Sequence, residues 1–285
     1  MKIKNRRTGI VVLLLTFSNL FPQDAKKDSL KIGWNNRMVG ILNLTQSKFD
    51  NWQQGGENSV AWQLNVNSEF IYEQTGYSWK NTGNVSFGMI KLAAQESRKS
   101  VDEIRLGTVL TYKVSQYVNP YVSATGETQF IKGYNYADDQ KTEISNFMDP
   151  AFLMQSAGFG YSSSPAFTTR LGAALKETIT ENHPQYADDP DTPEIEETRV
   201  EFGAESVSDL RKKLAENLLL TSRLELFSNF AAFNEIDVRW DNMFSAQVAK
   251  YMDVNLNIKI FYDRDISRKR QIKQVMALGL TYSFI

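Results

Sequence analysis

The sequence predicts an all-β fold: a closed, antiparallel, transmembrane up-and-down β-barrel of about twelve strands. Segments of about 9 to 15 residues alternate apolar and polar side chains, as strands do when one face meets lipid and the other a polar lumen. Aromatic residues make up 12% of the chain, which favours sheet over helix. After residue 20, no apolar run approaches the roughly 20 residues that a membrane-spanning helix requires.

Residues 1–23 are predicted to be a signal peptide. Four basic residues precede the apolar stretch from Ile10 to Phe17, and Pro22 lies in the polar segment that follows. The alternative, an N-terminal membrane anchor, is disfavoured because the apolar stretch is much shorter than a membrane span. We therefore expect export, an N-terminal periplasmic segment over residues 24–36 and a barrel over residues 37–285.

Residues 60–73 show the alternation most clearly. Val60, Trp62 and Leu64 share one face, whereas Gln63 and Asn65 share the other. A soluble β-sandwich also alternates, but its strands average only about five or six residues. Three other segments are similarly clear: 103–114, 214–227 and 236–248. Seven weaker ones and the closing segment 273–285 complete the count, the weaker ones being 38–45, 77–90, 120–132, 151–161, 167–178, 198–206 and 254–262.

The connections between these segments alternate in length. The longer set, expected to be extracellular, comprises 46–58, 91–102, 133–150, 179–197, 229–235 and 263–272. The shorter set, expected to be periplasmic, comprises 74–76, 115–119, 162–166, 207–213 and 249–253. Outer-membrane barrels have long extracellular loops, short periplasmic turns and an even number of strands. The pattern thus predicts a location in the outer membrane of a Gram-negative bacterium, in contact with its lipids.

The charges of the chain fall on the faces expected to point into the lumen. The candidate pore-lining residues are Glu69, Arg105, Lys113, Glu127, Arg223, Glu225, Asp237, Arg239 and Asp241. Unpaired charge is prohibitive in an apolar core, so we expect a lumen that is either wet or closed by ion pairs. A barrel of about twelve strands is intermediate between filled and channel-forming sizes, so both alternatives stay open. The net charge of −1 and the lack of a basic cluster argue against nucleic-acid binding.

No residue pattern indicates catalysis, and we expect no enzyme, no cofactor and no metal site. The chain has no cysteine and a single histidine, His183, which lies in an expected loop away from any evident nucleophile. Two expected loops repeat Tyr-Ala-Asp-Asp, at residues 136–139 and 186–189. Carboxylates suit Ca²⁺, but this spacing matches no defined calcium loop.

The segment Leu42-Asn43-Leu44-Thr45-Gln46, followed by Asn51-Trp52 and Gly55-Gly56-Glu57-Asn58, resembles an envelope protein family of Bacteroidota, domain of unknown function 3078. The resemblance extends over residues 30–285 and implies an outer-membrane barrel without an established reaction. The candidate motif loop contains Asn51, Trp52, Gly55 and Gly56. Trp52 either anchors the loop or folds its ring over the barrel rim or into the lumen. The closing segment Leu278 to Phe284 looks like the strand signal that the barrel assembly machinery recognises.

Together these features predict a small pore or transport protein for polar solutes. The alternative is a structural or accessory barrel that transports nothing and docks on a larger envelope complex.

Overall fold

A computed structural model of the chain describes residues 31–50, 57–93, 95–136, 141–164, 166–188, 193–233, 235–264 and 269–284. The predicted signal peptide and the candidate motif residues Asn51, Trp52, Gly55 and Gly56 lie outside these residues. No helix in the described part of the chain is long and apolar enough to cross a membrane.

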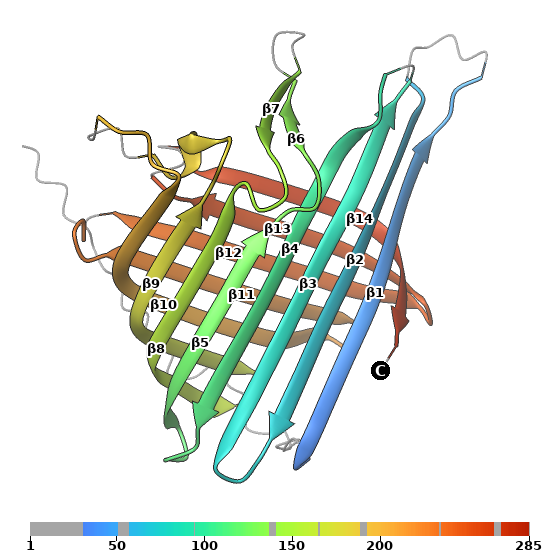
Figure 1. The fold of residues 1–285 in the computed structure, drawn as a ribbon. Coiled ribbons are helices and arrows are strands. Elements are labelled where there is room, and N and C mark those ends of the chain that lie inside the picture. Colours follow the sequence, from blue (N-terminus) through green and yellow to red (C-terminus); the bar gives the residue numbers. More distant parts are fainter. Residues whose placement is uncertain are drawn as a thin grey trace, which may run out of the picture.

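Twelve long strands form one closed sheet, and a short two-stranded hairpin stands on top of it (Figure 1). The barrel strands are β1 (Gly33–Ser47), β2 (Ser59–Glu73), β3 (Tyr77–Leu92), β4 (Arg98–Tyr112), β5 (Val118–Thr128), β8 (Ala151–Ser164), β9 (Phe167–Ile179), β10 (Thr198–Ala215), β11 (Leu218–Asn229), β12 (Ile236–Ala249), β13 (Met252–Tyr262) and β14 (Gln271–Ser283). The hairpin consists of β6 (Gly133–Asn135) and β7 (Thr142–Ser145), and a short 3-10 helix, η2 (Pro184–Tyr186), lies in the loop between β9 and β10.

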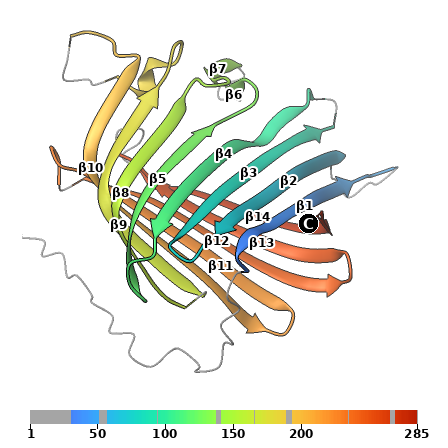
Figure 2. The same ribbon diagram turned by 60° about the horizontal axis from the view of Figure 1, so that its bottom comes forward.

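Every barrel strand pairs in antiparallel fashion with its neighbours along the chain, and β1 pairs with β14 to close the sheet. The closed order is β1-β14-β13-β12-β11-β10-β9-β8-β5-β4-β3-β2. Five strands thus separate β4 from β12 on either side, so these two strands lie on opposite walls of the barrel (Figure 2). The fold class predicted from the alternation, a closed antiparallel barrel of twelve strands, is confirmed.

One turn was predicted in the wrong place. Residues 207–213 were expected to form a periplasmic connection, but they continue β10, which runs to Ala215, and the turn lies at 216–217. The charged run from Asp209 to Lys213 resembles a turn in the sequence because it breaks the apolar alternation. Asp209 points into the lumen, where its carboxylate pairs with Arg223, so the charge belongs to the inner wall. The barrel also begins earlier than predicted: β1 starts at Gly33, four residues before the expected start at residue 37.

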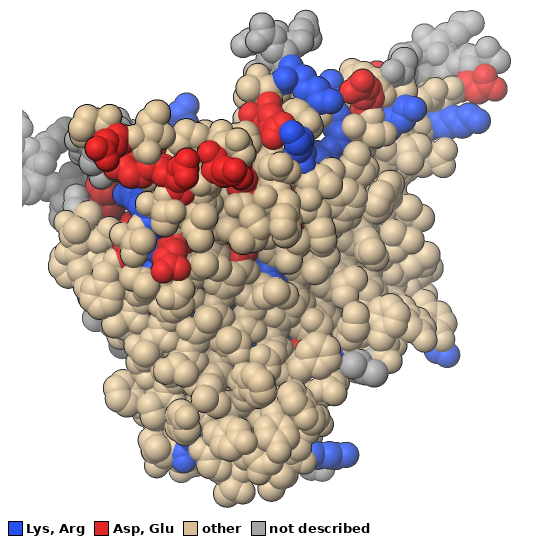
Figure 3. All heavy atoms as spheres, in the orientation of Figure 1, with Lys and Arg blue, Asp and Glu red and all other residues tan. Residues whose placement is uncertain are grey.

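The distribution of polarity is the reverse of that in a water-soluble protein. Outward side chains are large, apolar and exposed, such as Leu171 (63%), Phe159 (63%) and Leu106 (58%). Inward side chains include charged groups that are nearly inaccessible, such as Glu205 (5%) and Lys176 (8%). Figure 3 shows a wall almost bare of charge between two charged ends. Such a surface is stable where it meets hydrocarbon instead of water.

The two ends of the barrel differ in the length of their connections. At the end where β2 turns into β3, the connections have two to five residues, whereas those at the opposite end have five to twenty-two. Asn119 stabilises one short turn, because its Oδ1 accepts hydrogen bonds from the backbone N–H groups of Val114 and Ser115 at 2.8 and 2.9 Å. The long loops and the β6–β7 hairpin gather at the other end (Figure 1).

The seam that closes the barrel is short. The β1–β14 ladder has five residue pairs, from Val39–Ser283 to Asn43–Gly279, whereas every other strand pair in the barrel has eight to fifteen. Residues 44–47 of β1 pair with β2 alone, and residues 271–278 of β14 pair with β13 alone. The wall is therefore closed by hydrogen bonds only in the half of the seam that lies nearer the short turns.

Candidate functional site

A network of ion pairs fills part of the lumen, and we call it the lumen network. Its members are Glu103 and Arg105 of β4, Glu127 of β5, Asp209 of β10, Arg223 and Glu225 of β11, Arg239 and Asp241 of β12, and Lys259 of β13. Side chains alternate along each strand, so these residues all stand on the inward face while the intervening apolar residues face outward.

The strongest links of the network cross the lumen from wall to wall. Arg239 of β12 contacts Glu103 of β4 at 2.9 Å, and those two strands are diametrically opposed. Its guanidinium also bonds Glu127 of β5. Lys259 of β13 reaches the same Glu103 carboxylate at 2.7 Å. The side chains of these four residues retain only 17–22% exposure, which means that they fill the lumen at this level while keeping some contact with water.

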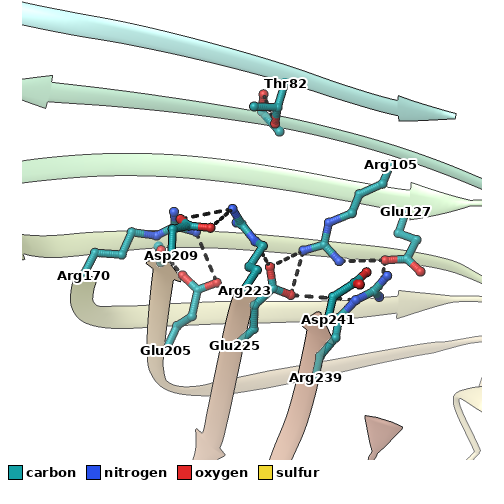
Figure 4. A network of polar contacts seen from close by, with 12 residues as sticks. Thr82, Arg105, Glu127, Arg170, Glu205, Asp209, Arg223, Glu225, Arg239 and Asp241 are labelled. Atoms are coloured by element: carbon teal, nitrogen blue, oxygen red, sulfur yellow. Dashed lines mark hydrogen bonds and ion pairs between the residues drawn. The ribbon is translucent and has the colours of Figure 1, made fainter. Parts of the chain in front are cut away.

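A second set of links joins β4 to β11 (Figure 4). Arg105 Nη2 donates to both oxygens of Glu225 at 2.6 and 2.7 Å, and its Nη1 donates to Glu127 at 2.9 Å. Arg223 donates through Nε to the same Glu225 at 2.5 Å and contacts Asp209 at 3.1 Å. Arginine suits such positions because its planar fork holds two carboxylates at once and keeps its charge.

A hydroxyl-rich patch adjoins the network on β5, β8, β9 and β10. Ser156 donates to Glu205 at 2.5 Å, and Arg170 lies 3.7 Å from the same carboxylate. Tyr121 and Ser123 contact the Ser156 hydroxyl at 3.3 and 2.8 Å. These bonds satisfy the carboxylate of Glu205, which is only 5% exposed.

Nearer the long loops, one ammonium group is surrounded by three carboxylates. Lys176 Nζ lies 2.6 Å from Asp237, 2.9 Å from Asp263 and 3.2 Å from Glu201. Its charge also lies 5.5 Å from the centre of the Phe227 ring. The excess of carboxylates gives this part of the lumen a negative character.

Three other inward cations have no carboxylate within 4.0 Å among the described residues: Arg37 of β1, Arg211 of β10 and Lys273 of β14. Arg37 is the register partner of Glu69 on β2, but Glu69 forms its ion pair with Lys80 instead. Arg211 lies on the wall opposite β2, and its charge interacts with both Arg37 and Glu69. Lys273 is the register partner of Lys259 in the lumen network. The described part of the lumen thus contains cations in direct ion pairs and cations without a carboxylate in direct contact.

The structure brings six of the nine predicted pore-lining residues into the lumen network: Arg105, Glu127, Arg223, Glu225, Arg239 and Asp241. Asp237 joins the Lys176 cluster, and Glu69 pairs with Lys80 nearer the short turns. Lys113 lies outside the lumen network: β4 ends at Tyr112, and the Lys113 ammonium contacts Glu73 at the end of the barrel that has the short turns.

Sequence reasoning missed several lumen residues, among them Asp209, Arg211 and Asp263. Asp209 and Arg211 were assigned to a turn, although their odd numbering within a longer β10 would have placed them on the inner face. Asp263 comes one residue after β13 and belongs to an expected loop, so alternation gave no signal for it.

Two long loops are clamped together above the barrel by Asp149. This carboxylate, only 4% exposed, accepts hydrogen bonds from the Thr180 hydroxyl and from the backbone N–H groups of Glu181 and Asn182, the latter two at 3.0 and 2.9 Å. Burial alone would raise the pKa of Asp149, but these hydrogen bonds outweigh it and lower the pKa to about 2.

His183, in the same loop, is buried, and its Nε2 lies 3.6 Å from Glu143 of β7. The described residues contain no group of three or more His, Asp or Glu side chains that could hold a metal ion. The repeated Tyr-Ala-Asp-Asp segments lie partly outside the described residues.

A family model of proteins of unknown function, DUF3078, matches residues 44–134. The resemblance predicted from the sequence is therefore confirmed over these residues, although the family description assigns no activity. No curated protein matches this sequence.

Among solved structures, the chain is similar to the translocator domain of the autotransporter NalP from Neisseria meningitidis, at 10% identity, with 90% of each chain covered and a TM-score of 0.41. It is also similar to the COG4313 outer membrane channel from Pseudomonas putida F1, at 12% identity, with 93% of this chain and 98% of that chain covered and a TM-score of 0.40. These similarities assign no function to this protein.

Proposed function

We propose that this protein is an outer-membrane barrel with a narrow channel for small polar solutes, held closed in the described conformation by the lumen network. The outward apolar wall supports a membrane location, because such a surface would be unfavourable in water. The alternation of short turns and long loops supports an outer-membrane orientation with both termini in the periplasm, and assembly through the C-terminal strand fits that orientation.

The single observation that carries the closed-channel proposal is that Arg105 and Arg239 bind carboxylates on the facing walls of the barrel. A plug of this kind consists of side chains alone, which change rotamer on a picosecond-to-nanosecond timescale where they are exposed. The partial exposure of the Arg223 and Asp209 side chains, 36% and 43%, leaves water beside the network. A network that is both cross-linked and partly wet is suited to closing a channel reversibly.

Planar-bilayer recording tests this proposal. The wild type is expected to show low single-channel conductance, and the double variant Arg105→Gln/Glu225→Gln at least a threefold higher conductance, because it removes a cross-lumen pair while conserving net charge. The matched control is Lys132→Gln/Glu143→Gln, which removes an exposed pair at the β6–β7 hairpin, away from the lumen. A wild type with steady, large conductance would refute the closing role of the network.

A second candidate function is an accessory barrel that transports nothing and docks on an envelope complex. The cross-lumen pairing itself favours it, since a permanently closed lumen needs no solute. The same recordings separate the two: the accessory role requires that neither the wild type nor Arg105→Gln/Glu225→Gln conducts, together with co-purification of partner proteins in mild detergent.

A further inference from the structure

The incomplete seam between β1 and β14 leaves two strand edges facing one another. Beyond the last seam pair, Asn43–Gly279, both strands continue: β1 through residues 44–47 and β14 through residues 271–278. No β1–β14 pair joins these described residues. In Figures 1 and 2, the two strands diverge toward the end that carries the long loops. We call this unpaired stretch of the seam, residues 44–47 of β1 and 271–278 of β14, the seam opening.

An unpaired strand edge is costly in a membrane. Each backbone N–H or C=O group left without a partner in hydrocarbon costs several kcal/mol, which is why membrane barrels normally close completely. The edges at the seam opening must therefore meet water from the lumen or polar groups of a bound molecule. A route between the lumen and the bilayer satisfies this requirement, whereas a sealed lipid-facing wall does not.

The two sides of the seam opening differ in chemistry. Outward, Leu44, Ile272 and Met276 are 58%, 58% and 72% exposed, and they form an apolar surface along both edges. Inward, β14 places Lys273 on the lumen side, where no carboxylate of the described residues lies within 4.0 Å. The Lys273 ammonium interacts with Glu103 and Asp241 only beyond ion-pair distance. An ammonium without a carboxylate in direct contact, beside an apolar edge, matches a molecule with a negatively charged head and an apolar tail.

We propose that the seam opening is a lateral binding site for an anionic amphiphile with a single acyl chain. The acyl chain lies against Leu44, Ile272 and Met276, and the anionic head enters the gap to pair with Lys273 and to accept hydrogen bonds from unpaired backbone N–H groups. The head then sits next to Lys259, the register partner of Lys273 and a member of the lumen network. This inference rests on the membrane location proposed above but does not require the channel to conduct.

Cysteine pairs test whether the opening exists, and the chain contains no cysteine of its own to interfere. A disulfide requires Cα atoms within about 7 Å. Leu42→Cys/Leu280→Cys occupies a paired position of the seam and should cross-link readily under mild oxidation. Leu44→Cys/Leu278→Cys extends the same register by two residues per strand on the same outward face and should cross-link at least tenfold less. Equal cross-linking of both pairs would eliminate the opening.

Photolabelling tests the ligand. The wild-type barrel in phospholipid nanodiscs would be exposed to a diazirine-bearing hexadecanoic acid and, in parallel, to the corresponding neutral alcohol, and the labelled residues located by mass spectrometry. We expect the acid to label residues 44–47 and 271–278. We expect at least fivefold less labelling in Lys273→Gln, near wild-type labelling in Lys273→Arg, and no effect of Lys273→Gln on the alcohol.

The control Lys250→Gln removes the same charge from the short turn between β12 and β13 and should leave labelling unchanged. Heat-modifiable gel mobility verifies that each variant folds. Labelling spread evenly around the barrel, or labelling that Lys273→Gln leaves intact, would overturn the proposal. A channel that fails to conduct would refute the proposed function while leaving the photolabelling result unaffected, so the two failures are distinguishable.

Discussion

Removing Arg239 is the most direct test of the lumen network. This residue contacts Glu103 at 2.9 Å, bonds Glu127 and lies 4.0 Å from Glu225, so Arg239→Gln would leave three carboxylates with one fewer cation. At 2.9 Å and an effective dielectric constant of about 20, one such ion pair is worth roughly 6 kcal/mol before the cost of desolvation. Desolvation offsets a large part of this attraction.

The net effect is smaller than the Coulomb energy. Breaking a fully buried ion pair by removing one partner costs roughly 3–5 kcal/mol. The Arg239 side chain is 18% exposed and its partners 15–22%, so water partly screens the charges left behind. We therefore expect Arg239→Gln to lower the free energy of unfolding by about 2–3 kcal/mol. Arg239→Lys, which keeps the charge but loses the planar fork, should fall between the variant and the wild type.

Urea titration of the barrel folded in lipid vesicles, followed by tryptophan fluorescence, would measure this loss. Lys132→Gln serves as the control, because its ion pair with Glu143 is exposed to solvent and contributes little to stability. A double-mutant cycle with Glu103→Gln should return a coupling energy of at least about 1 kcal/mol across the lumen. A loss for Arg239→Gln no larger than for Lys132→Gln, with zero coupling to Glu103, would refute the view that the network braces the barrel.

Two further predictions concern the loop clamp and the packing of the wall. Asp149→Asn should weaken the clamp by about 1–3 kcal/mol, since an NH2 group replaces one of the two buried carboxylate oxygens that accept these hydrogen bonds, and it should speed proteolysis within residues 180–197. The pKa of Asp149 in the folded protein, about 2, lies below the usual value for an aspartate, about 3.9, so this contribution is present above about pH 4 and is lost as the pH falls toward 2. A wild-type loop whose proteolysis rate is constant across that range would contradict it. Gly172→Ala should prevent or slow folding, because the added Cβ would lie 2.7 Å from the Tyr121 hydroxyl and would also clash with the carbonyl oxygen of Ala157. Gly160→Ala is the control, because its Cβ would come no nearer than 3.7 Å to any neighbour, so this variant should fold normally. Heat-modifiable gel mobility measures folding in both variants.

The sequence alone determined the barrel and its polarity. A period of two residues over long segments such as β2 places apolar side chains on one face and polar ones on the other, and only closure satisfies every strand edge in lipid. The same alternation indicated that Arg105, Glu225 and Arg239 point inward. The alternation gave a wrong prediction at β10, where the charged residues of the inner wall have the composition of a turn. Local composition does not distinguish residues that meet water in a loop from residues that meet water inside a barrel.

Only the tertiary structure decided which charges meet. Arg239 and Glu103 are 136 residues apart in the chain, and they touch because strand order and barrel radius set β12 opposite β4. The short seam is likewise invisible in the sequence, since nothing in the residues of β1 or β14 marks where their mutual pairing stops. How far two strands at opposite ends of a chain pair depends on the accumulated twist and register of the ten strands between them, which no local pattern encodes.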